Sequence, residues 1–414
     1  MKSVTELLTL ALLAATIGTV CLADGLREAV LRDAALDNGL LPATSTNIST
    51  PQNLVSIGQK LFESRLLSFS QDTACASCHL DQFGSADGLP NAIGTEGEGV
   101  GSQRILNGGD IIPRSVLPLW GRGEKGFDVL FWDGKVDHSQ EPMISQFGVH
   151  SPSKDPLVVA AHLPPVEIGE MVIDQQATVE LQTERLETAE VLYEMLAERV
   201  RLDPVLGPEL AQAKSIETSD IEFLDVAEAL AAFIRSNFRL KATKFHEFVF
   251  NGEDLSEVET AGGLLFYGRG RCAQCHNGPF FSDLAFHSLP FPQVGFGKNG
   301  FGVDYGRFNV TLVADDRYLF RTPPLYNVTA TSPYSHSGSV TGIADAIRAH
   351  VDPLSLIDTQ TMNLLERVDY YDRLRGWAAS SLGGVVLDDS DLKALEAFLG
   401  TLSFESDVPV AVVD

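Results

Sequence analysis

The pentapeptide Cys75-Ala76-Ser77-Cys78-His79 recurs as Cys272-Ala273-Gln274-Cys275-His276, and these two stretches are the most informative part of the sequence. C-x-x-C-H is the sequence at which c-type haem is attached covalently. The two cysteine sulfurs form thioethers with the porphyrin, and the adjacent histidine then ligates the iron. The motifs therefore predict two haem c groups, with His79 and His276 as axial ligands.

The residues that precede the two motifs also repeat. Gly58-x-x-Leu61-Phe62 comes before the first motif and Gly262-x-x-Leu265-Phe266 before the second. A four-cysteine zinc site is the alternative interpretation. However, zinc-binding pairs are usually roughly 15–20 residues apart, and zinc does not explain a histidine after both pairs. Two copies of a haem-binding unit account for all of these features.

Composition agrees with this interpretation. The chain has 414 residues and is 44% hydrophobic, which is enough for two globular domains with their own cores. Of its five cysteines, Cys21 lies in a predicted leader. Haem attachment uses the other four, so we expect neither a disulfide framework nor a cysteine nucleophile.

The formal charge of −26 disfavours nucleic acid as a partner, because phosphates would be repelled. Such a surface favours solubility and can steer a basic protein partner. A generic acidic secreted protein would have the same charge, so the sequence leaves both interpretations open.

Residues 1–23 resemble a cleaved signal peptide, with Lys2, an uncharged apolar run and a small residue, Ala23, at the end. The run is shorter than the ~20 residues of a membrane-spanning helix, and no stable membrane span is expected. A retained anchor or a lipid on Cys21 is the alternative. Because c-type haem is attached outside the cytoplasm, we expect a periplasmic or secreted protein.

Hydrophobic periodicity predicts a mainly α fold: two cytochrome c-like haem domains with long loops and little β structure. Residues 24–50 are expected to be an N-terminal extension, 51–240 the first haem domain and 241–414 the second, with a closing helix. The expected helices are Asp24–Asp37, Leu54–Leu67, Ala177–Leu202, Asp220–Leu240, Leu255–Tyr267, Ile343–His350 and Asp391–Leu402.

Several short segments around the two motifs are those of a known family. They are Leu66-Leu67-Ser68, Phe131-Trp132-Asp133-Gly134-Lys135, Glu170-Met171, Phe320-Arg321-Thr322-Pro323-Pro324-Leu325-Tyr326-Asn327-Val328 and Thr331-x-Pro333-Tyr334-x-His336-x-Gly338. In this order, the chain resembles the di-haem cytochrome c peroxidase and MauG family over most of its length. The resemblance implies that peroxide reacts at the N-terminal haem, that the C-terminal haem relays electrons, and that Trp132 bridges the two.

The resemblance also implies the residues around the first haem. Where many members have a removable distal histidine, this chain has Thr95, so the first iron should have an open face without prior reduction. His138, His150 or His162 from the long insertion after Trp132 is the alternative ligand.

Glu170 matches the catalytic distal carboxylate and Pro164 the distal proline, with Glu167 as the rival carboxylate. A buried carboxyl with a raised pKa can move a proton between the two oxygens of peroxide. The distal glutamine of the family is absent, since Ala160 stands at its position, and Gln146 is a candidate replacement.

At the second haem, the position of the family's sixth iron ligand is His350, with His336 as its competitor. Two imidazole ligands predict a low-spin haem with a lower potential than a His/Met haem. Family members often hold calcium between the haems. Thr331 and Pro333 match two of its carbonyl donors, but the expected asparagine is missing near residues 113–115, so calcium is possible but unsupported.

Three functions follow from these observations. The first is a secreted di-haem peroxidase that reduces hydrogen peroxide with electrons from a small cytochrome or cupredoxin. The second is a MauG-like enzyme that oxidises Trp or Tyr side chains of a partner protein. The third is a non-enzymatic di-haem electron carrier. The sequence names neither the donor nor the protein substrate.

Overall fold

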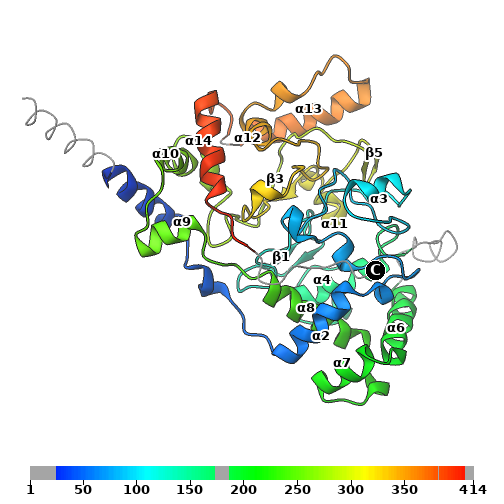
Figure 1. The fold of residues 1–414 in the computed structure, drawn as a ribbon. Coiled ribbons are helices and arrows are strands. Elements are labelled where there is room, and N and C mark those ends of the chain that lie inside the picture. The colour runs from blue at the N-terminus through cyan, green and yellow to red at the C-terminus, as the bar shows by residue number, and fades with distance from the viewer. Residues whose placement is uncertain (1–24, 173–185, 381, 406–414) are drawn as a thin grey trace, which may run out of the picture.

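The computed structural model describes residues 25–172, 186–380 and 382–405. Helices dominate these residues, and strands occur only as two-stranded antiparallel pairs (Figure 1). The expected mainly α class with little β structure is therefore confirmed. None of the helices described here is long and apolar enough to cross a membrane. The predicted signal peptide, residues 1–23, lies outside the described residues.

The secondary structure has the following bounds. Residues 25–37 are helical, in agreement with the expected helix Asp24–Asp37. The helices after residue 50 include α2 Gln52–Glu63, α3 Ser102–Leu106, α4 Pro156–His162, α6 Leu186–Leu202, α7 Leu206–Lys214, α8 Phe223–Asn237, α9 Lys244–His246, α10 Glu257–Tyr267, α11 Phe308–Thr311, α12 Ile343–Val351, α13 Leu364–Ala378 and α14 Asp389–Gly400. The strand pairs are β1 Val129–Leu130 with β2 Val136–Asp137, β3 Phe286–His287 with β6 Phe320–Arg321, and β4 Phe296–Gly297 with β5 Gly300–Phe301.

In the first half of the chain, α2 crosses α8 (Figure 1). The crossing point is Gly58, where an added Cβ would lie 2.0 Å from the carbonyl oxygen of Ala229. Glycine is thus required for the close approach of the two backbones. Phe62, one turn further along α2, packs against Phe233 of α8 with their ring centroids 5.1 Å apart.

The second half repeats this arrangement with α10 and α14 (Figure 1). An added Cβ on Gly262 would lie 1.9 Å from the carbonyl oxygen of Ala394. Phe266 packs against Phe398 of α14 at a centroid distance of 5.0 Å. The repeated Gly-x-x-Leu-Phe of the sequence is therefore a repeated helix crossing.

Each crossing places an aromatic ring beside a C-x-x-C-H motif. The ring of Phe62 lies 6.2 Å from that of His79. The ring of Phe266 lies 6.2 Å from that of Phe281, whose backbone is hydrogen-bonded to His276. The helix pairs thus fix the motifs in equivalent surroundings.

The segment before α2 packs on the second half of the chain, although it precedes the first half in sequence. Leu31 is fully buried, and its side chain lies against Gly263 of α10. The amide of Gly278, two residues after the second motif, donates to the carbonyl of Asn38 at 2.8 Å. The predicted extension 24–50 therefore forms part of the surroundings of the second motif.

The helices expected before each motif and at the end of the chain are present. Of the expected helix Ala177–Leu202, the described part is α6, which begins at Leu186. Helix α13 was not expected, because its apolar residues are not arranged as a buried stripe. Leu364 and Leu365, for example, are 76% and 77% exposed, so periodicity gives no signal.

Gly58→Ala should lower the free energy of unfolding by about 3 kcal/mol, because the added methyl group overlaps the Ala229 carbonyl and the helices must separate. Chemical denaturation of the holoprotein measures this. Gly400→Ala on α14 is the control: no atom lies within 4 Å of its added Cβ, so stability should change by less than about 1 kcal/mol. Equal stability of the two variants would contradict the crossing argument.

Candidate haem sites

The first motif forms a short 3₁₀ turn over Cys75–Ser77, and the amide of His79 donates to the carbonyl of Cys75 at 3.1 Å. Nδ1 of His79 lies 2.9 Å from the carbonyl oxygen of Ser85. Because a carbonyl only accepts, Nδ1 carries the proton and Nε2 keeps the lone pair that a metal needs. Burial lowers the pKa of His79 to about 4, so the ring is neutral.

The second motif repeats this geometry. Its 3₁₀ turn covers Cys272–Gln274, and the amide of His276 donates to Cys272 at 2.9 Å. Nδ1 of His276 donates to the carbonyl of Phe281 at 3.0 Å, which again leaves Nε2 as the free acceptor. Burial lowers the pKa of His276 to about 4. Each motif therefore offers one neutral imidazole with its coordinating nitrogen unprotonated.

The four cysteines fit covalent haem attachment. All four are free thiols, and burial raises the pKa of Cys75, Cys78 and Cys272 to about 12. Within the described residues the two cysteine pairs do not come together as a four-cysteine metal site, since a compact metal-ligand group contains only Cys275 of the four. The paired thiols and the free Nε2 atoms together match the donor set of two haem c groups.

One compact group with metal-ligand chemistry involves the second motif. Cys275, Asp283 and His287 have ligand atoms within 4.8 Å of one another, and His287 is hydrogen-bonded to Asp283 at 2.8 Å. Because Cys275 is the second attachment cysteine of its motif, its sulfur belongs to the thioether. The remaining pair is an ordinary His–Asp contact.

His350 lies opposite His276. Their ring centroids are 6.4 Å apart, and two imidazoles bound to one metal at ~2 Å per nitrogen have centroids about 6 Å apart. Nδ1 of His350 donates to the carbonyl of Ala346 at 2.7 Å, so its Nε2 is also the unprotonated nitrogen. The spacing fits a metal between the two rings.

His336, the competing candidate, has other partners. Its Nε2 lies 2.6 Å from Oε1 of Gln293, and its ring stacks on Phe320 with centroids 3.8 Å apart. Its side chain is buried, and burial lowers its pKa to about 3. With Nε2 already hydrogen-bonded, His336 has the surroundings of a structural histidine.

The two candidate carboxylates differ in charge state. Glu167 is ion-paired with Lys135 at 3.3 Å and with Lys298 at 2.6 Å, and these ammonium groups hold its pKa well below the usual range. Glu170 has no such partner. Burial and the nearby Glu167 raise its pKa to about 7, while Lys135 opposes the shift.

Glu170 also lies beside the first motif. Its negative charge raises the pKa of the Cys75 and Cys78 thiols, which places the carboxylate near both. Pro164 opens the 3₁₀ turn Pro164–Val166 and accepts the amide of Glu167 at 3.1 Å. The turn therefore leads directly into the segment that carries Glu170.

Thr95 lies on the same side of the site and is fully buried. Its amide donates to the carbonyl of Gly169 at 2.9 Å, and its hydroxyl donates to Asp110 at 2.9 Å. The hydroxyl is therefore bound within the protein. That Thr95 stands where other members have a removable histidine stays a prediction from the resemblance.

The histidines near the insertion at 140–163 have surroundings of their own. His162 is packed among the rings of Phe147, Tyr193 and Phe223. His138 is hydrogen-bonded to Glu141 at the surface, and His150 is exposed. Gln146, the candidate distal glutamine, is exposed as well.

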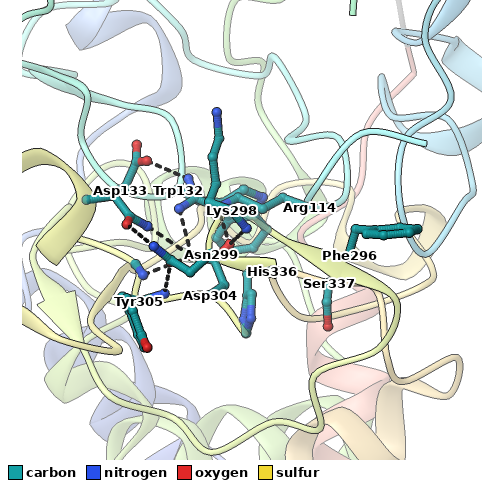
Figure 2. Close-up of polar contacts among 12 residues, drawn as sticks. Arg114, Trp132, Asp133, Phe296, Lys298, Asn299, Asp304, Tyr305, His336 and Ser337 are labelled. Atoms are coloured by element: carbon teal, nitrogen blue, oxygen red, sulfur yellow. Dashed lines mark hydrogen bonds and ion pairs between the residues drawn. The ribbon is translucent and has the colours of Figure 1, made fainter. Parts of the chain in front are cut away.

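Trp132 joins segments from both halves of the chain. Its indole Nε1 donates to the carbonyl of Ser115 at 2.9 Å, and its own carbonyl accepts the amide of Arg321 at 2.8 Å. Figure 2 draws Trp132 together with Arg114 and Asp133. The indole is half-buried, and the hydrogen bonds of Trp132 connect it to one segment of each half.

A buried ionic cluster surrounds this contact (Figure 2). Arg114 binds Asp133 at 2.6 Å and Asp304 through two hydrogen bonds of 2.8 and 2.9 Å. The Arg114 guanidinium holds the pKa of both carboxyls below the usual range, although their burial opposes this. A protein cation therefore neutralises these carboxylates, which come from both halves of the chain.

The calcium donors stay a prediction. Thr331 uses its hydroxyl to bind the carbonyl of Val328 at 3.1 Å, and Pro333 follows in the same loop. Arg114 lies near the position expected for the family's asparagine, and it forms ion pairs with Asp133 and Asp304. We make no calcium proposal.

Two residues of this region carried no sequence signal. Arg122 and Arg321 are buried, and each has a terminal guanidinium nitrogen without a hydrogen-bond partner. Arg321 belongs to the Phe-Arg-Thr-Pro-Pro segment, which served only as a family marker. A buried arginine without an anionic partner can be recognised only from the residues packed around it in the structure.

Two haem-attachment motifs in one mainly helical chain, each with a prepared proximal histidine, define a c-type di-haem protein. A family model described as di-haem cytochrome c peroxidase matches residues 52–255. The chain is 26% identical over 315 residues to the methylamine utilization protein MauG of Methylorubrum extorquens, covering 75% of this chain and 71% of that protein. Cytochrome c551 peroxidase of Pseudomonas aeruginosa is 24% identical over 296 residues, covering 70% and 69% respectively.

The fold is also that of solved structures. A MauG-like protein associated with microbial copper homeostasis aligns with a TM-score of 0.61 at 21% identity, covering 88% of this chain and 92% of that one. The diheme peroxidase BthA from Burkholderia thailandensis aligns with a TM-score of 0.61 at 18% identity, covering 88% and 89%. This chain belongs to the di-haem cytochrome c peroxidase and MauG family, and it is a di-haem oxidoreductase.

His350→Ala should abolish the low-spin electron paramagnetic resonance signal of the second haem, because His276 would lose its partner across the iron. The signal of the first haem should stay unchanged. His336→Gln is the control, and it should leave both signals as they are. A lost low-spin signal in His336→Gln with an unchanged spectrum in His350→Ala would reverse the assignment.

Proposed function

We propose that this chain is an exported peroxidase that reduces hydrogen peroxide at the first haem site, held by Cys75, Cys78 and His79. The observation that carries the proposal is Glu170, a carboxyl beside the first motif whose pKa is raised to about 7. Haem iron bound there supplies the two-electron redox chemistry. Together with two protons and two electrons, each peroxide yields two waters.

Glu170 is suited to proton transfer because both of its protonation states are accessible near neutral pH. As a carboxylate it accepts the proton of one peroxide oxygen, and as an acid it returns that proton to the leaving oxygen. Lys135 keeps the pKa of Glu170 from rising further. Glu167, held as an anion by two lysines, is unsuited to this exchange.

Thr95 supports a site that is open in the oxidised protein. Its hydroxyl is bonded to Asp110, and the histidines His138, His150 and His162 have surroundings elsewhere. We therefore infer that peroxide enters without prior reduction of the other haem. This property is common to the peroxidase and MauG-like versions of the proposal.

Electrons would reach the first site from the second, which we assign to His276 and His350, through Trp132. The indole Nε1 is hydrogen-bonded to the carbonyl of Ser115, and the backbone carbonyl of Trp132 accepts the amide of Arg321, so both the ring and the main chain are anchored. A small cytochrome or cupredoxin with a basic face is the proposed donor, because the chain carries a formal charge of −26. The signal-like residues 1–23 and the motifs for covalent haem attachment support a location in the periplasm or outside the cell.

The MauG-like version is the second candidate. Relatives include proteins named MauG, and both Thr95 and the atypical sixth-ligand position His350 favour this version. In that version, Trp or Tyr side chains of a partner protein supply the electrons and are covalently changed. The sixth-ligand position is Met in the peroxidases and Tyr in MauG, so His350 weighs only against copying the electronic properties of MauG directly. The third hypothesis, a non-enzymatic electron carrier, is set aside because the chain belongs to a family of enzymes.

Glu170→Gln should reduce kcat/KM for peroxide by at least about 100-fold, because proton transfer is lost. In the wild-type protein kcat/KM should fall as pH drops below about 7, since protonated Glu170 cannot accept the peroxide proton; the variant should lack this limb. Steady-state kinetics with a chemical reductant measure both quantities.

The control for this prediction is Glu167→Gln. Removing the anion lowers the pKa of Glu170, so the acidic limb should move to lower pH while the rate at neutral pH stays within a few-fold of wild type. If Glu167→Gln, and not Glu170→Gln, abolishes activity, the roles of the two carboxylates are reversed.

The fully oxidised protein should react with one equivalent of peroxide in stopped-flow absorbance at the same rate as protein with one haem reduced. A large acceleration by prior reduction would contradict the inference from Thr95. Adding either a reduced small cytochrome or a Trp-containing partner then separates the two versions by which one is oxidised catalytically.

A further inference from the structure

Arg122 lacks a counter-ion although it is only 3% exposed. Its Nε and Nη2 donate to the carbonyl of Pro118 at 3.1 and 3.0 Å, and Nη1 has no partner. No ion pair to a carboxylate occurs for Arg122 within the described residues. A buried guanidinium without an anion is strongly disfavoured.

Arg321 has the same deficit and is 1% exposed. Its Nε donates to the carbonyl of Phe131 at 2.9 Å and Nη1 to that of Thr322 at 3.0 Å, while Nη2 is unpaired. In the described part of the chain, no carboxylate forms an ion pair with it. Burial lowers its pKa to about 9.

The two guanidinium groups lie close together. Both pack over the ring of Phe127, with Cζ–centroid distances of 4.5 Å for Arg122 and 5.6 Å for Arg321. The positive charge of Arg321 also lowers the pKa of Arg122. Contact with a ring face attracts a cation, but it satisfies neither unpaired N–H group. Two buried like charges near one ring are stabilised by an anion in contact with them, and no carboxylate of the described residues forms an ion pair with either.

Each arginine is connected to one motif. Arg122 lies in the loop after Trp120, whose indole donates to the carbonyl of Gly84 at 2.9 Å, next to the Ser85 carbonyl that holds His79. The amide of Leu119 in the same loop donates to the Ser85 hydroxyl at 2.8 Å. The loop that carries Arg122 is therefore anchored to the proximal side of the first site.

Arg321 is anchored to the second site. It lies on β6, which pairs with β3 in the register Phe286↔Arg321. The carbonyl of Thr322 also accepts the hydroxyl of Ser282 at 2.6 Å, six residues after His276. Asp283, whose amide donates to Cys275 at 2.7 Å, is close enough to influence Arg321 electrostatically.

We propose that Arg122 and Arg321 form a shared anion site for haem propionates, Arg122 binding a propionate carboxylate of the first haem and Arg321 one of the second. The proposal rests on haem occupancy of both motifs. Carboxylates are the preferred partners of guanidinium groups, which bind them through two parallel N–H donors. The unpaired Nη atoms provide such donors at a position shared by both sites.

A buried cation beside a haem stabilises the reduced state, because reduction lowers the positive charge of the iron. Replacing Arg122 should therefore shift the first haem toward the ferric state, and replacing Arg321 should shift the second. Because both guanidinium groups pack on the Phe127 ring and interact electrostatically, each substitution should also shift the other haem by a smaller amount.

Spectroelectrochemistry of the di-haem holoprotein tests this proposal. Arg122→Gln should shift the redox equilibrium of the first haem at least tenfold toward ferric, which is about 59 mV for one electron. Arg321→Gln should do the same to the second haem, and Arg122→Lys should restore most of the loss. The control is Arg199→Gln, since the guanidinium of Arg199 is bonded to the carbonyls of Ser68 and Phe69. It should change either equilibrium less than twofold.

The denaturation midpoint of the holoprotein is a second measurement that tests the same proposal. Arg122→Met should lower the midpoint if a propionate is its partner, because the carboxylate would lose its cation. It should raise the midpoint if the guanidinium is truly unpaired. Two bound haems with unshifted potentials, or a raised midpoint, would overturn the proposal. A preparation without covalent haem would instead refute the occupancy on which both proposals depend.

Discussion

Each proximal histidine donates its Nδ1 proton to a backbone carbonyl, and the helices packed around each motif keep this hydrogen bond in place. Ser85 supplies the acceptor for His79 and Phe281 the acceptor for His276. The bond fixes the tautomer and ring orientation, so that Nε2 is the coordinating nitrogen. The glycine crossings and the phenylalanines that follow them hold the motifs against these carbonyls.

The carboxylates around these sites differ in whether a cation is in contact with them. Carboxylates that must stay ionised have cations in contact, as Glu167 has with two lysines and Asp304 with Arg114. Glu170 lacks such a contact, and its pKa is raised to about 7. The difference between two glutamates three residues apart thus comes from lysines placed by distant loops.

The local parts of this arrangement were accessible from the sequence. The C-x-x-C-H motifs and the repeated glycines predicted the two units and the helices before them. The sequence could not indicate which side chains pair with each other when they lie far apart along the chain. Lys298 lies 131 residues from Glu167, with which it pairs, and Gln293 lies 43 residues from His336. Helix α13 cannot be predicted from periodicity, because its exposed leucines form no buried stripe. Arg122 and Arg321 cannot be predicted either, because a buried arginine without an anionic partner has no characteristic sequence pattern.

The packing of Leu31 against Gly263 and of Asn38 against Gly278 has a consequence for how the chain is assembled. Residues 25–50 complete the surroundings of the second motif, although the first haem unit lies between these two segments in the sequence. The two units are therefore not separable by a single cut near residue 240. A C-terminal fragment would lack one of its own walls, so the two halves are interlocked through chain order as well as through their interface.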